Sequence, residues 1–164
     1  MNFRAGMALL GALLGSVAAF VWWTSQALPE TVASHFALSG EADGFSARAD
    51  YVATMMEMVV LVPLLPALLP GALLRGGAGL NIPDREYWLA SERKDATLAF
   101  VRVHGLWLAG ALALFLGFVH FLTVEANAQK PPVLSNGGFV AGLVMFLGLT
   151  AVWVWLLFAR FRRP

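Results

Sequence analysis

The stretch that decides the fold runs from Leu98 to Val124 and reads LAFVRVHGLWLAGALALFLGFVHFLTV. A helix needs about 20 apolar residues to cross the hydrocarbon core of a bilayer, and this stretch exceeds that length. Three further apolar spans, 5–28, 52–74 and 137–159, are of similar length. The sequence therefore predicts an all-α membrane protein: one integral-membrane domain over residues 1–164, built as a bundle of four transmembrane helices. The first span exceeds the roughly 7 to 15 apolar residues of a signal-peptide core, so we expect it to remain as a helix.

The composition agrees with a membrane protein. The chain of 164 residues is 59% hydrophobic and 13% charged, whereas soluble domains are about 45 to 50% apolar. Its net charge of +1 gives no reason to expect a nucleic-acid partner, and membrane lipid is the predicted environment. The chain contains no cysteine, which excludes disulfides, thiolate nucleophiles and cysteine-ligated metals.

The distribution of Lys and Arg predicts the orientation in the membrane. Nine of the 11 basic residues fall on one side of the four spans: Arg4, Arg75, Arg85, Arg93, Lys94, Arg102, Arg160, Arg162 and Arg163. Only Arg48 and Lys130 fall on the other side. By the positive-inside rule both termini are expected in the cytoplasm, and the loops 29–50 and 127–136 are expected to face outward.

Three spans carry small residues at four-residue spacing, which lets helix backbones approach closely. The stripes are Gly11 and Gly15, Ala109, Ala113 and Gly117, and Gly138 and Gly142. We expect all three to face the inside of the bundle. The second span contains Pro63, Pro66 and Pro70, which remove backbone donors and should kink or loosen its cytoplasmic half.

The two longer connections carry the most distinctive residues. The outer loop contains LPETVASHFALSGEADGF from Leu28 to Phe45, and the inner loop contains NIPDREYWL from Asn81 to Leu89. Together they resemble an uncharacterised bacterial membrane-domain family that also forms the N-terminal part of SdpI-type toxin-immunity proteins. The residues that match the outer motif are His35, Phe36, Gly40 and Asp43, and those that match the inner motif are Asn81, Pro83, Arg85, Tyr87 and Trp88. Asp84 stands where the family more often has Asn.

The resemblance implies a multi-pass protein of the bacterial cytoplasmic (inner) membrane. In SdpI-like proteins the membrane part is thought to neutralise a secreted peptide toxin, and some members relay that event to a cytoplasmic repressor. The resemblance therefore implies an extracytoplasmic peptide or protein ligand for this chain. This chain lacks the additional helices of longer members, so an immunity role is an expectation only. The resemblance brings no catalytic residue and no cofactor.

Turn chemistry and apolar residues predict an ordered outer loop between helices 1 and 2. Ser39-Gly40 and Asp43-Gly44 favour turns, and the apolar side chains of the loop are expected to pack on the helix ends. These side chains are Val32, Phe36, Leu38 and Phe45. The loop is interpreted either as a structural cap or as a recognition surface that uses His35, Glu41 and Asp43. The inner loop, 75–97, either locks the second and third helices together or docks a cytoplasmic partner.

Two ionisable residues inside the spans suggest a site. Glu57 and His120 lie at similar depth, some 6 to 8 Å below the outer boundary at about 1.5 Å per residue. Intramembrane ionisable groups usually face the bundle interior and find partners, so we expect Glu57 and His120 to pair beneath the loop. The pair is interpreted as structural, as a group that couples a proton or ligand, or as part of a metal site. At the cytoplasmic end of the third span, Arg102 is expected to snorkel to lipid headgroups, and His104 is expected to be a hydrogen-bonded core histidine.

No enzyme signature is present: the chain has no Gly-rich phosphate loop, no GxSxG elbow and no recognisable triad. We therefore expect a binding, immunity or sensory module that acts through its outer loop and the Glu57/His120 region. The alternatives are a small transporter or metal-dependent membrane enzyme that uses the same pocket, or an accessory subunit of a larger membrane complex.

Overall fold

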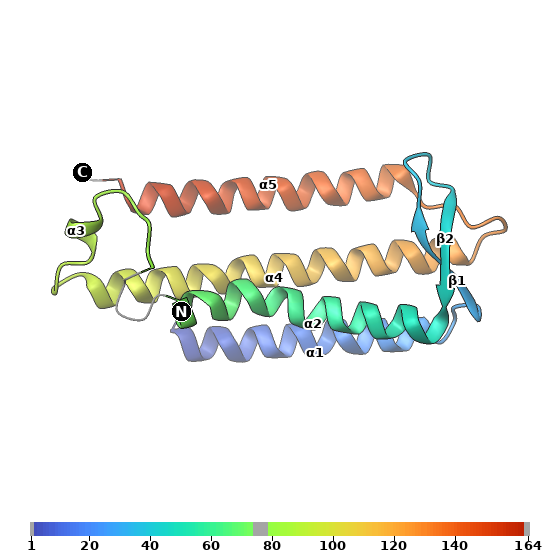
Figure 1. Cartoon of the computed structure of the whole chain (residues 1–164), viewed down its shortest axis with the longest axis horizontal. Helices are drawn as coiled ribbons and strands as arrows, with labels where there is room; N and C mark the ends of the chain where they lie inside the picture. The colour runs from blue at the N-terminus through green and yellow to red at the C-terminus, as the bar shows by residue number, and fades with distance from the viewer. Residues whose placement is uncertain (1, 74–78, 163–164) are drawn as a thin grey trace.

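The computed structural model describes residues 2–73 and 79–162 (Figure 1). Four helices are long and apolar enough to cross a membrane: α1 (Phe3–Ser25), α2 (Arg48–Leu73), α4 (Lys94–Asn127) and α5 (Asn136–Arg160). A short helix, α3 (Arg85–Trp88), lies between α2 and α4. The four predicted spans are thus confirmed as helices. The end of the second span at Leu74, with Arg75 and Arg163, lies outside the described residues.

The prediction of an all-α fold is incomplete, because the outer loop forms a β-hairpin. Its strands are β1 (Thr31–Phe36) and β2 (Ala42–Ala47), paired antiparallel with Ala33 opposite Phe45. Figure 1 shows the hairpin lying across one end of the helices, roughly perpendicular to their axes, while both chain termini lie at the other end. We call these the hairpin end and the termini end.

Helix α4 is the centre of the bundle, because α1, α2 and α5 all pack against it. Its small-residue stripe faces α1, where Leu10, Leu14 and Val17 are buried. Ala109 and Ala113 are completely buried, and a Cβ added at Gly117 would lie 3.2 Å from Val17 Cγ1. Large side chains of α1 therefore pack onto the small face of α4, and the prediction that this stripe faces inward is confirmed.

The other two stripes differ from each other. A Cβ at Gly142 would overlap the ring of Phe118, so this stripe of α5 faces α4 as predicted. Gly11 and Gly15 are exposed, and a Cβ at either position would meet nothing within 4 Å. The prediction for α1 is therefore wrong. The physical reason is that α1 buries its larger side chains against the small face of α4, which turns its own small face outward.

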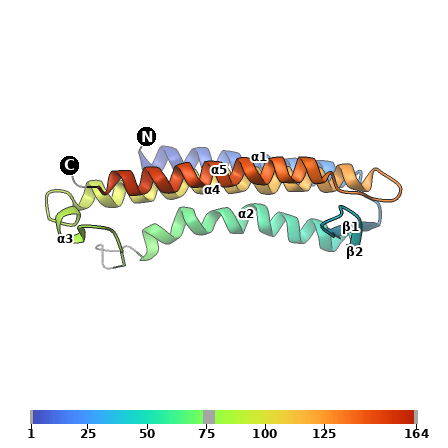
Figure 2. The ribbon, with the colours of Figure 1, turned by 90° about the horizontal axis from the view of Figure 1, so that it is seen from above.

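Helix α2 is continuous through Pro63, Pro66 and Pro70, and Figure 2 shows it as a curved helix. A proline at position i removes the hydrogen-bond donor for the carbonyl of residue i−4. Pro70 therefore leaves the carbonyl oxygen of Pro66 without its helical partner. This oxygen faces α4 at Gly105, so closely that a Cβ at position 105 would overlap it.

Helix α5 packs mainly on α4, and most of its surface is exposed along the membrane-spanning length (Figure 1). A reciprocal pair of hydrogen bonds joins the two helices toward the termini end. The Trp153 indole donates to the His104 carbonyl oxygen at 2.9 Å, and His104 Nε2 lies 3.1 Å from the Trp153 carbonyl oxygen. The two rings stack with centroids 5.1 Å apart. His104 is therefore buried and hydrogen-bonded, which confirms that prediction.

Candidate functional site

The hairpin is fixed to the bundle at its base by two polar side chains. Asn127, at the end of α4, pairs with both backbone groups of Ala33: its Oδ1 accepts from the Ala33 N–H at 2.8 Å, and its Nδ2 donates to the Ala33 carbonyl at 3.0 Å. Arg48 donates to the Leu28 carbonyl at 2.9 Å, and so ties the start of α2 to the end of α1. Val32 and Ala33 of β1 are completely buried.

The hairpin tip is fixed to the connection between α4 and α5. Gly40 has φ of 89°, a left-handed conformation that suits glycine. Its carbonyl accepts from the Leu134 N–H at 2.8 Å, and a Cβ at Gly40 would lie 2.7 Å from the Leu134 carbonyl oxygen. Asn136 donates to the Leu38 carbonyl at 2.9 Å, and Glu41 forms an antiparallel bridge with Val133. Gly40 of the outer motif therefore has a structural role at the tip.

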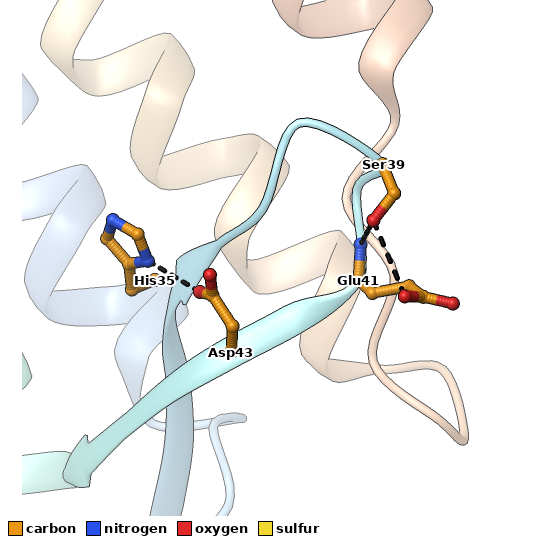
Figure 3. A network of polar contacts seen from close by, with 4 residues as sticks. All are labelled: His35, Ser39, Glu41 and Asp43. Atoms are coloured by element: carbon orange, nitrogen blue, oxygen red, sulfur yellow. Dashed lines mark hydrogen bonds and ion pairs between the residues drawn. The ribbon is translucent and has the colours of Figure 1, made fainter.

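Figure 3 shows the polar side chains near the tip. His35 Nδ1 and Asp43 Oδ1 lie 2.5 Å apart, from the facing strands β1 and β2. Both side chains are exposed, His35 by 76% and Asp43 by 47%. A Cβ at Gly44 would lie 2.8 Å from His35 Cβ, so Gly44 makes room for the histidine. The structure thus brings His35 and Asp43 of the outer motif together on a surface that is open to solvent.

Two apolar side chains of the hairpin also face outward. Leu38, at the tip, is fully exposed and Phe45, on β2, is 58% exposed. The prediction that Leu38 and Phe45 pack on the helix ends is therefore wrong. Val32 alone of the four predicted anchors is fully buried, while Phe36 is partly exposed. Successive side chains of a strand point to opposite faces, so the apolar residues of the hairpin cannot all face the bundle.

One edge of the hairpin is open at its middle. Because Asn127 binds the backbone of Ala33, the Ala33 N–H and C=O point away from β2. Phe45 lies directly opposite Ala33, so its N–H and C=O point away from β1 in an antiparallel pair. Among the described residues, β2 has β1 as its one strand neighbour, and the bridge from Val133 reaches Glu41 nearer the tip. The backbone of Phe45 therefore faces an unoccupied strand edge.

His120 lies beneath the hairpin, completely buried where α1, α2 and α4 meet. Its Nε2 is 2.8 Å from Thr24 Oγ1 and its Nδ1 is 2.9 Å from the Tyr51 hydroxyl. The Thr24 hydroxyl also donates to the Phe20 carbonyl at 2.8 Å. Since that hydroxyl has one proton, the network is satisfied when Nε2 carries the ring proton and Tyr51 donates to Nδ1. His120 therefore joins three helices.

The predicted pairing of Glu57 with His120 is wrong. Glu57 is exposed, on the face of α2 opposite the buried residues Met55 and Val59. It has no hydrogen bond or ion pair to another described residue. The sequence gives the two residues a similar depth, but Glu57 lies on a face of α2 that points away from the bundle, whereas His120 faces its interior. Sequence reasoning missed Thr24 and Tyr51 as partners, although both carry hydroxyls and lie near the hairpin ends of their helices.

The inner motif forms a compact structure at the termini end. Trp88 of α3 is buried and donates to the Phe161 carbonyl at 3.3 Å, while its ring lies under the guanidinium of Arg160 at 4.4 Å. The Trp88 carbonyl accepts from the Thr97 hydroxyl at 3.0 Å. The motif thus attaches α3 to the start of α4 and to the end of α5. The sequence left open whether the inner loop locks the second and third helices together or docks a cytoplasmic partner, and the described residues show Trp88 in contact with α4 and with the end of α5.

The remaining inner-motif residues are more exposed. Arg85 donates to the Leu80 carbonyl at 3.2 Å, and the Tyr87 ring lies 4.1 Å from the Arg93 guanidinium. Asn81 and Pro83 are exposed before α3. Nearby, hydrogen bonds from its own backbone and from Ser91 hold the pKa of the Glu92 carboxyl below its usual range.

The predicted site residues therefore fall into separate places. His35, Phe36, Gly40 and Asp43 lie on the hairpin, His120 lies buried below it, Glu57 faces outward from α2, and the inner motif lies at the opposite end. Within residues 2–73 and 79–162, no group of three or more His, Cys, Asp or Glu side chains is placed to hold a metal ion. Asn127 and Asn136, which position the hairpin, were not predicted.

Four helices of this chain are long and apolar enough to cross a membrane. By their length and composition, the chain is a multi-pass membrane protein. Comparison with protein-family models, curated proteins and solved structures finds no match.

Proposed function

We propose that this protein is a membrane-anchored recognition module that binds an extracytoplasmic peptide or protein segment through its hairpin, as an immunity or sensory protein of the SdpI-like kind. The observation that carries this proposal is the exposure of Leu38 and Phe45 on a hairpin that is fixed at both its base and its tip. Exposed apolar side chains on a rigid element favour binding, because little conformational entropy is lost when a partner covers them.

The open edge of β2 indicates how such a partner is recognised. An extended segment that pairs with the backbone at Phe45 would add a strand to the hairpin, and backbone hydrogen bonds would supply affinity. The Phe45 side chain and the His35–Asp43 pair then give selectivity, since they present an apolar and a polar group beside the same strands. Leu38 extends the apolar contact toward the tip.

The test is selection from a random peptide library on the protein in lipid nanodiscs. We expect peptides that bind the wild type and lose at least tenfold in affinity to the double variant Leu38→Ser/Phe45→Ser. Ser34→Ala, an exposed substitution on β1, is the control and should bind as the wild type does. A loss of affinity supports the proposal only if the double variant keeps its thermal unfolding temperature. Selected peptides that bind wild type and double variant equally would contradict the proposal.

A second function, as a subunit of a larger membrane complex, is favoured by Glu57. An ionisable side chain on the outward face of a transmembrane helix is unfavourable in hydrocarbon, and such residues usually pair with another group. A partner helix with a hydrogen-bond donor at the same depth would satisfy the carboxylate. Co-purified subunits that are lost in Glu57→Leu and retained in Leu61→Ala, a change on the exposed surface of the same helix, would support this function.

A further inference from the structure

The free edge of β2 faces away from the centre of the bundle. Asn127 of α4 binds the outer edge of β1 at Ala33, so β2 lies on the side of β1 that is away from α4. Figure 2 shows the hairpin on the same side of α4 as α2. At Phe45 the backbone of this edge has no strand partner among the described residues, and the Phe45 side chain is exposed. A segment that adds a strand here would therefore lie on the α2 side of the molecule, above the end of the helices.

The charged side chains of the hairpin loop are mostly acidic. The loop 29–50 carries four carboxylates and one guanidinium, a formal net charge of −3 with histidine neutral. The carboxylates, all on exposed residues, are Glu30, Glu41, Asp43 and Asp50. The guanidinium of Arg48 donates to the Leu28 carbonyl, and Asp43 pairs with His35. The hairpin therefore presents an excess of negative charge to its surroundings.

Two of these carboxylates lie next to the free edge. The alternating exposure along β2 puts Asp43 and Phe45 on its solvent face. Asp50 follows the end of β2 by three residues and is exposed in the first turn of α2. It precedes Glu57 by two helical turns, and therefore shares the outward face of α2 with it. Asp43 thus lies on the solvent side of the free edge, and Asp50 lies on its membrane side.

We propose that the extended segment bound at this edge is a cationic peptide with apolar residues, whose Lys or Arg side chains pair with Asp43 and Asp50. This inference rests on the proposed function and adds the charge of the ligand. In an added strand, successive side chains point to opposite faces. Those on one face would lie beside Phe45 and Asp43, and those on the other would point toward the membrane boundary at Asp50. Basic side chains suit the second position as well, because their stems can lie in apolar surroundings while the charged head reaches a carboxylate.

Charge distinguishes this ligand from other occupants of the edge. An acidic segment can form the same backbone hydrogen bonds, but the loop would repel it. A second copy of this chain, paired through its own β2, would bring another loop with a net charge of −3 to the same edge, where like charges repel. A cationic peptide is complementary to the loop, and such complementarity speeds association and rejects wrong partners.

Peptide-library selection on the protein in nanodiscs of phosphatidylcholine tests the charge of the ligand. A zwitterionic lipid is required, because anionic lipid would itself attract basic peptides. We expect Lys and Arg to be enriched about twofold in the selected pool over the input library, as electrostatic complementarity requires. Raising the salt concentration from about 0.05 M to about 0.5 M should weaken a selected peptide about fivefold, since salt screens exposed charges.

Substitutions of single carboxylates test where the charge acts. Asp43→Asn and Asp50→Asn should each weaken a selected peptide about threefold, and together about tenfold, as expected for exposed charge pairs. The matched control is Glu125→Gln, which removes an exposed carboxylate near the end of α4, away from the free edge. It should change the affinity by less than about twofold, since it contacts no part of the added strand.

The outcomes separate this inference from the proposed function. Selected peptides without enrichment of Lys and Arg, whose binding is still lost in Leu38→Ser/Phe45→Ser, would overturn this inference alone. Equal losses from Asp43→Asn, Asp50→Asn and Glu125→Gln would also overturn it, because the charge would then act without pairing at the edge. So would a dimer that Leu38→Ser/Phe45→Ser dissociates, because a second copy would then occupy the edge. If no peptide is selected, or if the double variant binds as the wild type does, the proposed function fails and this inference fails with it.

Discussion

The carbonyl oxygen of Pro66 faces Gly105 across the interface of α2 and α4, at a distance that leaves no room for a side chain. Two sequence features combine at this point. Pro70 removes the donor that would normally bind this carbonyl, and Gly105 offers a bare backbone against which the oxygen packs. The same glycine would also bring a Cβ to 3.3 Å from Pro70 Cγ. The close contact of α2 with α4 therefore depends on the pairing of prolines with one glycine.

Gly105→Ala should destabilise the protein by about 1 to 3 kcal/mol, the usual result of overpacking a core. This is the reverse of the intrinsic effect, since alanine is about 1 kcal/mol more favourable than glycine inside a helix. Gly148→Ala is the control, because a Cβ there meets nothing within 4 Å. Thermal unfolding in mild detergent measures both. A Gly105→Ala variant as stable as Gly148→Ala would show that the helices do not approach this closely.

The hydrogen bonds of His120 should contribute modestly to stability. Tyr51→Phe removes the donor to Nδ1, and Thr24→Val removes the partner of Nε2. Each should lower the free energy of unfolding by about 0.6 to 1.7 kcal/mol, the range measured for hydrogen bonds within membranes. Glu57→Gln should change it little, because Glu57 faces away from the bundle. Equal losses from Glu57→Gln and Tyr51→Phe would indicate that Glu57 and His120 interact after all.

Asn127→Ala should loosen the base of the hairpin. The substitution removes both hydrogen bonds to the Ala33 backbone, while the tip contacts through Leu134 and Asn136 remain. We expect faster amide hydrogen exchange in the segment Thr31–Phe36, with unchanged exchange in α4 before position 123. Gln129→Ala is the control, since its side chain contacts its own loop. Unchanged exchange in the strand would show that Asn127 does not hold the hairpin.

The absence of native cysteine makes the predicted orientation easy to measure. Leu38→Cys places one thiol at the hairpin tip, and Asp84→Cys places one beside α3 at the opposite end. In intact cells, a membrane-impermeant maleimide should label Leu38→Cys directly and Asp84→Cys only after the membrane is permeabilised. The reverse pattern would place the hairpin in the cytoplasm and would contradict an extracytoplasmic ligand.

The helices could be predicted from the sequence, whereas the hairpin could not. About 20 consecutive apolar residues leave a membrane helix as the simplest structure, because every backbone group must be satisfied within the span. The strands TVASHF and ADGFSA have few β-branched residues, and their pairing is supported by contacts distant in sequence. Asn127 lies 94 residues from Ala33. The turn residues of the loop predicted order, but nothing local to it indicated those partners.

The direction in which a residue faces was the main source of error at the candidate site. A helix that is apolar on all sides gives no amphipathic pattern from which to infer its buried face. Depth could be estimated for Glu57 and His120, but the side of the helix could not. The same limit applies to Gly11 and Gly15, since a small-residue stripe suits either a neighbour within the bundle or an outward face. Contacts in three dimensions were needed to decide both.

The most direct test of hairpin recognition is hydrogen exchange of the segment Ala42–Ala47 with and without a peptide selected on the nanodisc-embedded protein. If the peptide pairs with the open edge of β2, exchange in this segment should slow at saturating peptide and stay unchanged in the Leu38→Ser/Phe45→Ser variant. Unchanged exchange in Ala42–Ala47, with protection appearing instead in α3 or on the outward face of α1, would contradict the account and place recognition elsewhere on the molecule.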